Sequence, residues 1–498
     1  VYIMENNEKN QQVKEGRMPH LWEALLSLAI LIGVLAVGII IYGVDPHVPM
    51  FIGACAAALM ALRLGYKWER IEKMMMDGIY KALQSVIILI IIGILVGIWV
   101  DAGVVPAMIY YGLKIIHPSI FLIAALIICS ITSLATGTSW GTVGTMGIAL
   151  MGISLGLGIN PAATAGACLS GAYFGDKMSP LSDTTNLAPA MAGTDVMTHV
   201  KFMILPTAVA YGLSIIFFGV LGFHYYQGGG ADLSSVAEIS NALKDSFTIN
   251  PFLLIPPIVV IVCVAMKMPA IPGIAIGAFV GAIMGALFGN SNLGTILDCG
   301  MNGFVSETGL ESVDNLLSTG GLMNMMNSVS MTLIAMMFGG IMEDTRQLQV
   351  IVNKLKPLAN TPAKLVILTE VTCFASNATM PEQYISIVVP GRMYAEEYHN
   401  MGLHPKTLSN ALEGAGTVSG AMIPWNTCGV YMSTTLKMSV GQYLPYVFFN
   451  YTMPIVVAIM ALLGLTCADM EGKRLNAKQA NSKEVTWPTK PIDGTVRI

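Results

Sequence analysis

The chain has 498 residues, of which 54% are hydrophobic and 11% are charged, and its formal net charge is −4. Soluble domains carry about 25% charged residues, so this composition excludes an ordinary soluble globular protein. The acidic balance leaves no basic face and gives no reason to expect a nucleic-acid partner. The 8 cysteines lie mainly inside apolar segments, which predicts small packing residues rather than a disulfide framework or a metal site.

Long apolar runs recur along the chain and are separated by short polar connections. Clear examples lie at residues 24–43, 83–100 and 443–465. A helix needs roughly 20 predominantly apolar residues to cross a bilayer. The sequence therefore predicts an all-α polytopic membrane protein with about ten crossings. The polar N-terminal tail, residues 1–20, does not resemble a signal peptide, and residues 469–498 form a second polar tail.

Lys and Arg are concentrated in some connections and almost absent from others. The basic connections are residues 63–73, 346–364, 392–406 and 473–474. The connections poor in Lys and Arg lie around Asp45, at 227–245 and at 290–318. The positive-inside rule places the basic connections in the cytoplasm. Both termini are then cytoplasmic.

The two halves of the chain share a spacing of prolines and aromatic residues. A single offset of 244 residues aligns Pro118 with Pro362, Trp140 with Tyr384, Pro161 with Pro405 and Pro180 with Pro424. The sequence identity between the halves is low, but the common spacing indicates that both halves adopt the same fold.

The repeat and the charge pattern together predict an inverted architecture. Each half makes about five crossings plus one pair of short helices that enters and leaves by the same face. The pair near 119–157 enters from outside, and the pair near 361–400 enters from inside. An odd number of crossings turns the second copy upside down, as is common in secondary transporters. The predicted boundaries are 21–223 for the first repeat, 224–250 for an extracytoplasmic loop and 251–468 for the second repeat.

Two polar clusters lie in the middle of the predicted helix pairs. Polar groups at membrane depth are costly and mark sites by default. Small hydroxyl residues and glycines suit a tight turn that faces an ion or a substrate, although close packing between helices is the alternative. The candidate residues are Thr136, Thr138, Ser139 and Trp140 in the first pair, and Asn377, Thr379 and Glu382 in the second.

The third polar cluster, residues 175–186, contains the strongest signal in the chain. Pro180 cannot donate to a helix ladder and disfavours helix at the preceding residue, so we expect a broken helix with free backbone groups. Carboxylates and hydroxyls beside such a break are hard oxygen ligands that suit Na⁺ or a proton. The candidates are Asp176, Ser182, Asp183, Thr184 and Asn186, with Asp176 and Asp183 as the Na⁺ ligands. The alternative is an ion pair between Asp176 and Lys177 that only braces the break.

The fourth cluster is the equivalent break in the second half and contains Trp425, Asn426 and Thr427 but no carboxylate. Glu413 and Glu370 are two further acids within apolar segments, and each either contributes to the site or pairs with a neighbour. One site at the repeat interface would bring several carboxylates together. Because like charges and desolvation both raise the pKa of a carboxyl group, such a site can exchange a cation for protons.

The sequence Gly171–Asn186, GAYFGDKMSPLSDTTN, closely resembles the NhaC family of Na⁺/H⁺ antiporters, and so does Thr136–Thr142. The likeness runs from about residue 20 to about residue 468. It implies inverted repeats with two re-entrant hairpins and two broken helices. It also implies a secondary transporter that exchanges Na⁺ for protons by alternating access in the cytoplasmic membrane of a prokaryote.

The resemblance leaves the cargo open. Members of the family include plain Na⁺/H⁺ exchangers and carriers of organic anions such as malate and lactate, and relatives are expected to carry amino acids. Trp140 and Trp425 are larger than a bare ion requires, so they either line a pocket for an organic solute or pack the hairpins. The expected partners are Na⁺, H⁺ and membrane lipid, with a small organic anion or amino acid as the alternative. No cofactor is expected, and a homodimer is left open.

Other classes of protein fit the sequence less well. Residues 137–141 match the G-x-S-x-G motif, but that motif requires a strand-to-helix turn, and here it lies between apolar helical segments. The chain has no G-x-x-x-x-G-K-[ST] loop, which argues against a primary pump. A passive channel would show no coupling to Na⁺ or protons. We therefore expect a transporter without catalytic residues.

Overall fold

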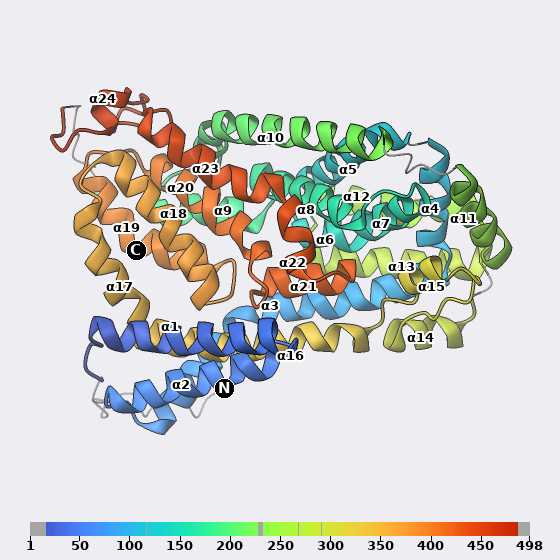
Figure 1. Ribbon diagram of the computed structural model, residues 1–498, viewed down its shortest axis with the longest axis horizontal. Coiled ribbons are helices and arrows are strands. Elements are labelled where there is room, and N and C mark those ends of the chain that lie inside the picture. The colour runs from blue at the N-terminus through green and yellow to red at the C-terminus, as the bar shows by residue number, and fades with distance from the viewer. Residues whose placement is uncertain (1–15, 116, 228–232, 267, 290, 487–498) are drawn as a thin grey trace.

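A computed structural model describes residues 16–115, 117–227, 233–266, 268–289 and 291–486 (Figure 1). Within these ranges the regular structure is helical, apart from two isolated β-bridges near the C-terminal end. This confirms the predicted all-α fold. The first half of the chain contains α1 (Leu21–Ala36), α2 (His47–Arg63), α3 (Trp68–Asp101), α4 (Val104–Ile115), α5 (Phe121–Thr136), α6 (Ser139–Thr142), α7 (Ile148–Gly156), α8 (Pro161–Met178), α9 (Asp183–Ala192) and α10 (Val196–Gln227).

The second half also combines long, short and broken helices. It contains α11 (Leu233–Ser246), α12 (Ile255–Ala265), α13 (Ala270–Phe288), α14 (Leu293–Asn302), α15 (Glu311–Leu317), α16 (Leu322–Asp344), α17 (Gln347–Leu355), α18 (Pro362–Thr379), α19 (Ile385–Asn400), α20 (Pro405–Leu412), α21 (Thr427–Leu436), α22 (Val440–Tyr443), α23 (Phe448–Leu462) and α24 (Ala477–Ala480). A π-helical turn, η6 (Glu413–Thr417), extends α20.

The membrane-crossing segments differ in length. In the described residues, 5 helices are long and apolar enough to cross a bilayer, or up to 7 if each bent pair counts as one span. The longest are α3 and α10, whereas α1, α2 and α4 are shorter apolar helices. These helices alone do not reach the predicted number of about ten crossings, which would require further spans built from short or broken helices.

The two helix breaks lie where the prolines predict them. The α8 helix ends at Met178, and α9 begins at Asp183 after a turn that contains Pro180. In the second half, the last helical turn before the break ends at Met422, and α21 begins at Thr427. Each boundary of the second break lies 244 residues after its counterpart, so the offset read from the prolines is also the offset of the folded elements.

The two helix pairs begin at opposite ends of the molecule. The α5–α7 pair follows α4 at one end, whereas the α18–α19 pair follows α17 at the other (Figure 1). The first pair turns at Gly137, which adopts a left-handed φ of 68°. Only glycine adopts such a conformation without strain. The second pair turns at residues 380–384.

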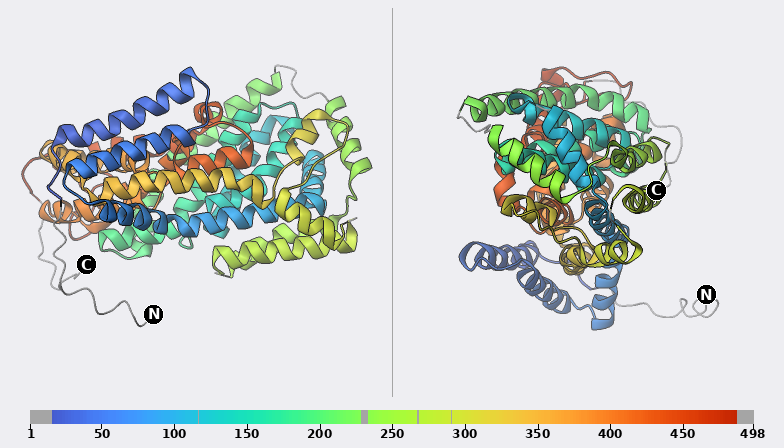
Figure 2. Two further views of the ribbon diagram at one scale, coloured as in Figure 1. Left: turned by 90° about the horizontal axis from the view of Figure 1, so that it is seen from below. Right: turned by 90° about the vertical axis from the view of Figure 1, so that its right-hand side faces the viewer.

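The α3 and α16 helices form an antiparallel pair along the length of the molecule (Figure 2). Glycines allow their backbones to touch. A Cβ atom on Gly78 would lie 2.3 Å from the Met336 carbonyl oxygen, and one on Gly340 would lie 2.2 Å from the Met74 carbonyl oxygen. Ion pairs tie the same ends together, such as Arg70 with Asp344 at 2.7 Å. Of the helices that flank the two breaks, α21 packs against α16.

The structure describes parts of the predicted tails and loop. Residues 1–15 of the predicted N-terminal tail and residues 487–498 of the predicted C-terminal tail lie outside the described residues. In the described part of the C-terminal tail, Leu475 and Ala480 are buried against the protein. The predicted loop at 224–250 contains α11, while residues 228–232 lie outside the description.

Candidate cation and substrate site

The turn of each helix pair contacts the break of its own half. In the first half, a Cβ atom on Gly137 would lie 2.7 Å from the carbonyl carbon of Leu181. In the second half, the Thr427 backbone amide donates to the Pro381 carbonyl at 3.0 Å. Gly137 and Pro381 are equivalent positions of the repeat. The four interruptions of helical structure that the sequence predicts thus form two matching junctions.

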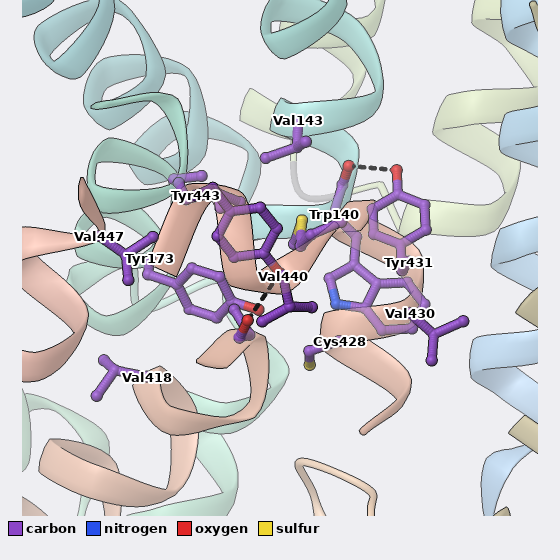
Figure 3. Close-up of a cluster of buried hydrophobic side chains, with 14 of the residues drawn as sticks. Trp140, Val143, Tyr173, Val418, Cys428, Val430, Tyr431, Val440, Tyr443 and Val447 are labelled. Atoms are coloured by element: carbon purple, nitrogen blue, oxygen red, sulfur yellow. Dashed lines mark hydrogen bonds between the residues drawn. The ribbon is translucent and has the colours of Figure 1, made fainter. Parts of the chain in front are cut away.

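Aromatic residues connect each turn to the broken helix of the other half. The Tyr384 hydroxyl, from the second turn, donates to Asp183 Oδ2 at 3.3 Å. The Tyr431 hydroxyl, from α21, donates to the Trp140 carbonyl at 2.7 Å. The rings of Trp140 and Tyr431 stack with their centroids 4.5 Å apart and their planes 9° apart (Figure 3). The two junctions are therefore joined at their centre.

A cavity of about 310 Å³ lies between these elements. Its wall combines the first turn, the first break, the second turn, one face of α3 and the start of α13. The lining residues are Gln84, Ile88, Thr136, Gly137, Thr138, Trp140, Asp176, Leu181, Ser182, Asp183, Thr184, Met268, Pro269, Ile271, Glu382, Gln383 and Tyr384. Eight of the sequence-predicted residues lie in this wall: Thr136, Thr138, Trp140, Asp176, Ser182, Asp183, Thr184 and Glu382.

Asp176 is buried at the cavity wall, with 6% of its surface exposed. Its Oδ2 atom accepts hydrogen bonds from the Ser139 hydroxyl at 2.6 Å and the Ser139 amide at 3.2 Å. Its Oδ1 atom accepts one from the Ser182 hydroxyl at 2.6 Å. Three donors on two oxygens are the environment that an ionised carboxylate accepts. Asp176 can therefore carry a negative charge at the cavity wall while these three hydrogen bonds hold its side chain in place.

Asp183 is the exposed carboxylate of the site and lies at the first turn of α9. A negative charge is favourable there because it faces the free amides of the helix N-terminus. The break exposes fewer carbonyls than the sequence predicts, since the Thr185 hydroxyl donates to the carbonyls of both Asp176 and Lys177, at 3.0 Å and 2.9 Å. The Asn186 side chain likewise donates to Pro180 and Ser182 carbonyls, so Asn186 supports the break instead of lining the cavity.

Glu382 lies at the second turn and is 1% exposed. Its Oε2 atom accepts hydrogen bonds from the backbone amides of Tyr384 at 2.6 Å and Ile385 at 3.4 Å. The carboxylate thus caps the start of α19 as well as lining the cavity.

Other predicted residues support the second junction from outside the cavity. Asn426 donates to the backbone and side-chain oxygens of Asn377, both at 3.0 Å, and accepts from the Cys428 amide. The Trp425 indole donates to the Ala378 carbonyl at 2.8 Å, and the Thr379 hydroxyl bonds back to its own helix. Thr427 lies at the start of α21, where its amide donates to the second turn.

Two further predicted residues lie elsewhere. Ser139 belongs to the first junction, where its hydroxyl donates to Asp176. Glu413 is fully buried and lies deeper than the cavity wall.

Lys177 does not serve as the partner of Asp176. The two side chains leave α8 in different directions, and Lys177 Nζ donates to Met203 Sδ at 3.1 Å on α10. The alternative of a bracing Asp176–Lys177 ion pair is therefore wrong for this structure.

Several wall residues were missed by sequence reasoning. Gln84 lies within an apolar span that carries no break signal, and Gln383 and Tyr384 are neighbours of the predicted Glu382. Met268 and Pro269 lie just before α13 and Ile271 lies in its first turn, and no polar residue marks this segment. For the part of the wall that α3 forms, the only signal in the sequence was the polar residue Gln84 itself, which lies just before Val86 in an apolar run.

The cavity can hold a cation through oxygen ligands. No group of three or more His, Cys, Asp or Glu side chains suited to a metal ion occurs in the described ranges. A Na⁺ ligand set here would therefore combine one or two carboxylates with hydroxyl and backbone oxygens. Broken helices, hairpin turns and buried carboxylates at one central cavity define the class of secondary transporters.

Comparison with known proteins identifies the family. The profile of the Na⁺/H⁺ antiporter family matches residues 20–172 and 171–465, and the chain belongs to this family. It is 37% identical to the malate-2H⁺/Na⁺-lactate antiporter of Bacillus subtilis, over 91% of this chain and 96% of that protein. It is 34% identical to the Na⁺/H⁺ antiporter NhaC of Alkalihalophilus pseudofirmus, over 89% of this chain and 95% of that protein. It is 36% identical to the arginine/ornithine antiporter ArcD of Halobacterium salinarum, over 90% of this chain and 93% of that protein.

Proposed function

We propose that this protein exchanges Na⁺ for protons at the cavity between the two junctions. The observation that carries the proposal is the position of Asp176, which is buried, hydrogen-bonded by three donors and still in the cavity wall. Asp183 and Glu382 add two carboxyl groups to the same cavity. Membership of the Na⁺/H⁺ antiporter family supports this choice of ions.

The exchange follows from competition for the same oxygens. A carboxylate that holds a proton is a poorer Na⁺ ligand, because the proton occupies a lone pair and removes the negative charge. Na⁺ binding therefore favours proton release to the side that the cavity faces. Movement of the central elements past α3 and α16 would then present the site to the other side. Each cycle thus couples opposite movements of Na⁺ and protons.

Ion flux in proteoliposomes tests this function. Purified protein is reconstituted with a pH indicator inside, and an outward or inward Na⁺ gradient is imposed. We expect Na⁺ to drive proton movement in the opposite direction, with apparent Na⁺ affinity falling as the pH falls. K⁺ at the same concentration is the matched control. Proton movement that ignores the Na⁺ gradient would contradict the proposal.

A small organic solute is the second candidate cargo. A volume of about 310 Å³ exceeds what a single Na⁺ ion needs and lies at the lower limit of small-molecule pockets, about 300–1,000 Å³. Trp140 supplies an apolar wall, and Gln84 and Gln383 supply neutral hydrogen-bonding groups. Two of the relatives are named for organic cargo.

The same proteoliposomes distinguish the two candidates. Exchange is measured without organic solute, and then with malate and lactate, or with arginine and ornithine, at matched ionic strength. Full Na⁺/H⁺ exchange without solute supports the first candidate. Exchange that requires one of the solutes supports the second.

We also propose that the protein lies in the cytoplasmic membrane with both termini in the cytoplasm. The support is the concentration of Lys and Arg in the connections at 63–73 and 346–364. Labelling of single cysteines from the two sides of the membrane tests this orientation.

A further inference from the structure

A cluster of buried ionisable residues lies beyond the cavity wall. Lys177 of α8 and Glu413 of η6 are 0% exposed, and Glu370 of α18 is 5% exposed. Glu370 packs on the turn that carries Glu413, since a Cβ atom on Gly414 would lie 3.2 Å from Glu370 Oε1. The Lys177 ammonium interacts electrostatically with both carboxyl groups. The cluster therefore joins residues from the two halves of the chain.

Other groups surround this cluster. Asp176 of α8 and Cys373 of α18 interact electrostatically with Glu413, Cys373 and Tyr398 of α19 do so with Glu370, and His199 of α10 does so with Lys177. The Thr417 hydroxyl of η6 lies beside Glu413. The neighbouring turns of α19 and α23 present Ser386, Ile387 and Val457 to η6. In the part of the chain that the structure describes, Lys177 is thus the cation that acts on the two glutamates, and it can neutralise one of them.

The two glutamates have unused hydrogen-bonding capacity. Among the described residues, Glu413 Oε2 and Glu370 Oε1 are buried without a hydrogen-bond partner. Buried polar atoms normally have partners, and a native exception calls for an explanation. With Lys177 charged, one proton shared by the two carboxyl groups leaves the cluster neutral. Loss of this proton leaves one uncompensated negative charge in the cluster, which favours the return of a proton.

A chain of hydroxyl groups connects the cluster to the cavity. The Ser182 hydroxyl lies 2.6 Å from Asp176 Oδ1 and 3.1 Å from the Thr184 hydroxyl. The Thr184 hydroxyl lies 3.2 Å from Glu413 Oε1. All three separations are within hydrogen-bonding distance, and both hydroxyls are buried. Each hydroxyl has one hydrogen to give and can accept another.

We propose that Glu413, together with Lys177 and Glu370, is a second proton-binding site that exchanges protons with Asp176 through Ser182 and Thr184. When Glu413 is protonated, it passes its proton to the Thr184 oxygen, Thr184 passes its hydrogen to Ser182, and Ser182 passes its hydrogen to Asp176. Three O–H bonds break and three form, so Glu413 becomes a carboxylate and Asp176 becomes protonated. Both hydroxyl groups are unchanged except in direction. This inference rests on the proposed Na⁺/H⁺ exchange at the cavity. It adds a second proton to each exchange cycle.

The number of protons moved per Na⁺ is the decisive measurement. In proteoliposomes with the membrane potential clamped to zero, the pH gradient that just stops net Na⁺ flux gives this ratio. Thr184→Val removes the hydroxyl and keeps the shape, so we expect the ratio to fall by one proton. Glu413→Gln should give the same fall. Thr184→Ser restores a hydroxyl at the same place and should restore the ratio of the unmodified protein.

An infrared measurement on purified protein provides an independent readout. Na⁺ addition should produce a difference spectrum with the carbonyl bands of two carboxyl groups that change protonation. Glu413→Gln should remove one of these bands and leave the band of Asp176. Thr184→Val should slow the appearance of the Glu413 band, whereas Thr184→Ser should not. This measurement requires no transport, and the unmodified protein alone already tests for two bands.

The outcomes separate the two proposals. If the unmodified protein exchanges no Na⁺ for protons, the proposed function fails. If it does, but Thr184→Val and Glu413→Gln keep the same ratio and the same infrared bands, the second proton site is refuted while the proposed function stands. A single carboxyl band in the unmodified protein also refutes the second site, even if a variant fails to fold.

Discussion

Individual side chains decide what the predicted acids can do. The sequence places Asp176 and Lys177 together, but adjacent residues of a helix point about 100° apart. Asp176 consequently meets Ser139 at the first turn, whereas Lys177 meets Met203 on α10. The types of residue at the site could be predicted, because carboxylates are costly within an apolar segment and therefore indicate a functional site. Their partners could not, since these come from helices that only the tertiary fold brings close.

Replacing Asp176 with Asn should damage both transport and stability. An amide keeps the size but turns one accepting oxygen into a donor, which then faces a donor from Ser139 or Ser182. An unsatisfied buried donor costs about 1–3 kcal/mol. We expect a lower unfolding temperature in a thermal-shift assay and loss of Na⁺-driven proton flux. Unchanged Na⁺ affinity and flux would show that Asp176 is not a ligand.

Replacing Asp183 with Asn is the matched comparison. Asp183 is exposed and accepts a hydrogen bond from the Tyr384 hydroxyl, from which an amide oxygen can also accept. The stability should therefore fall by no more than about 1 kcal/mol, the upper limit for losing an exposed negative charge at a helix N-terminus. Coupled exchange should nevertheless be abolished, because the cavity loses its exposed charge. Normal pH-dependent exchange in this variant would remove Asp183 from the site.

At the scale of elements, proline and glycine made the interruptions predictable. Pro180 and Pro424 mark the two breaks, and Gly137 marks the first turn. The bracing of the second break by Asn377 and Asn426 was not predictable, because both residues looked like ligands in the sequence. A buried amide serves equally well as a ligand or as a structural bridge, and only its neighbours decide.

The contact between turn and break can be tested with one substitution and a close control. Gly137→Ala introduces a methyl group 2.7 Å from the Leu181 carbonyl carbon, at a left-handed φ of 68°. Gly193→Ala introduces one at a similar φ of 84° but with nothing within 4 Å. The backbone strain alone costs about 1–3 kcal/mol. We therefore expect Gly193→Ala to lose only that amount and to transport normally.

Gly137→Ala should lose more stability than Gly193→Ala and should also lose transport, because the turn is forced away from the first break. Chemical unfolding and flux on the same preparations give both quantities. Equal losses in the two variants would mean that the contact between the turn and the break is not needed.

At the scale of the whole molecule, the repeat predicted more than single residues did. The 244-residue offset, read from four pairs of residues, recurs in the boundaries of both breaks. The glycine contacts between α3 and α16 were invisible in the sequence, because glycines are frequent throughout this chain. The contribution of the start of α13 to the cavity was equally hidden. Contacts between apolar helices that are far apart in the sequence involve no polar residue from which they could be predicted.

Labelling of single cysteines tests the orientation in the membrane. Cys55 is the exposed native cysteine, whereas the other seven are buried, so Cys55→Ser provides the background. Asn241→Cys and Lys483→Cys each place a thiol at an exposed position, one in α11 and one near the C-terminal end. A membrane-impermeant maleimide applied to intact cells should label residue 241 but label residue 483 only after permeabilisation. Labelling of both positions in intact cells would refute the orientation.

The aromatic contacts between the two halves bear on how efficiently an ion gradient is used. Tyr384 holds Asp183, and Tyr431 holds Trp140, so each turn is fastened to the broken helix of the other half. If one half moved alone, both hydrogen bonds and the ring stack would have to break together. That requirement disfavours a half-completed movement in which Na⁺ returns without its protons. The two contacts thus limit the leak by which a cell would dissipate its sodium gradient without receiving proton movement in exchange.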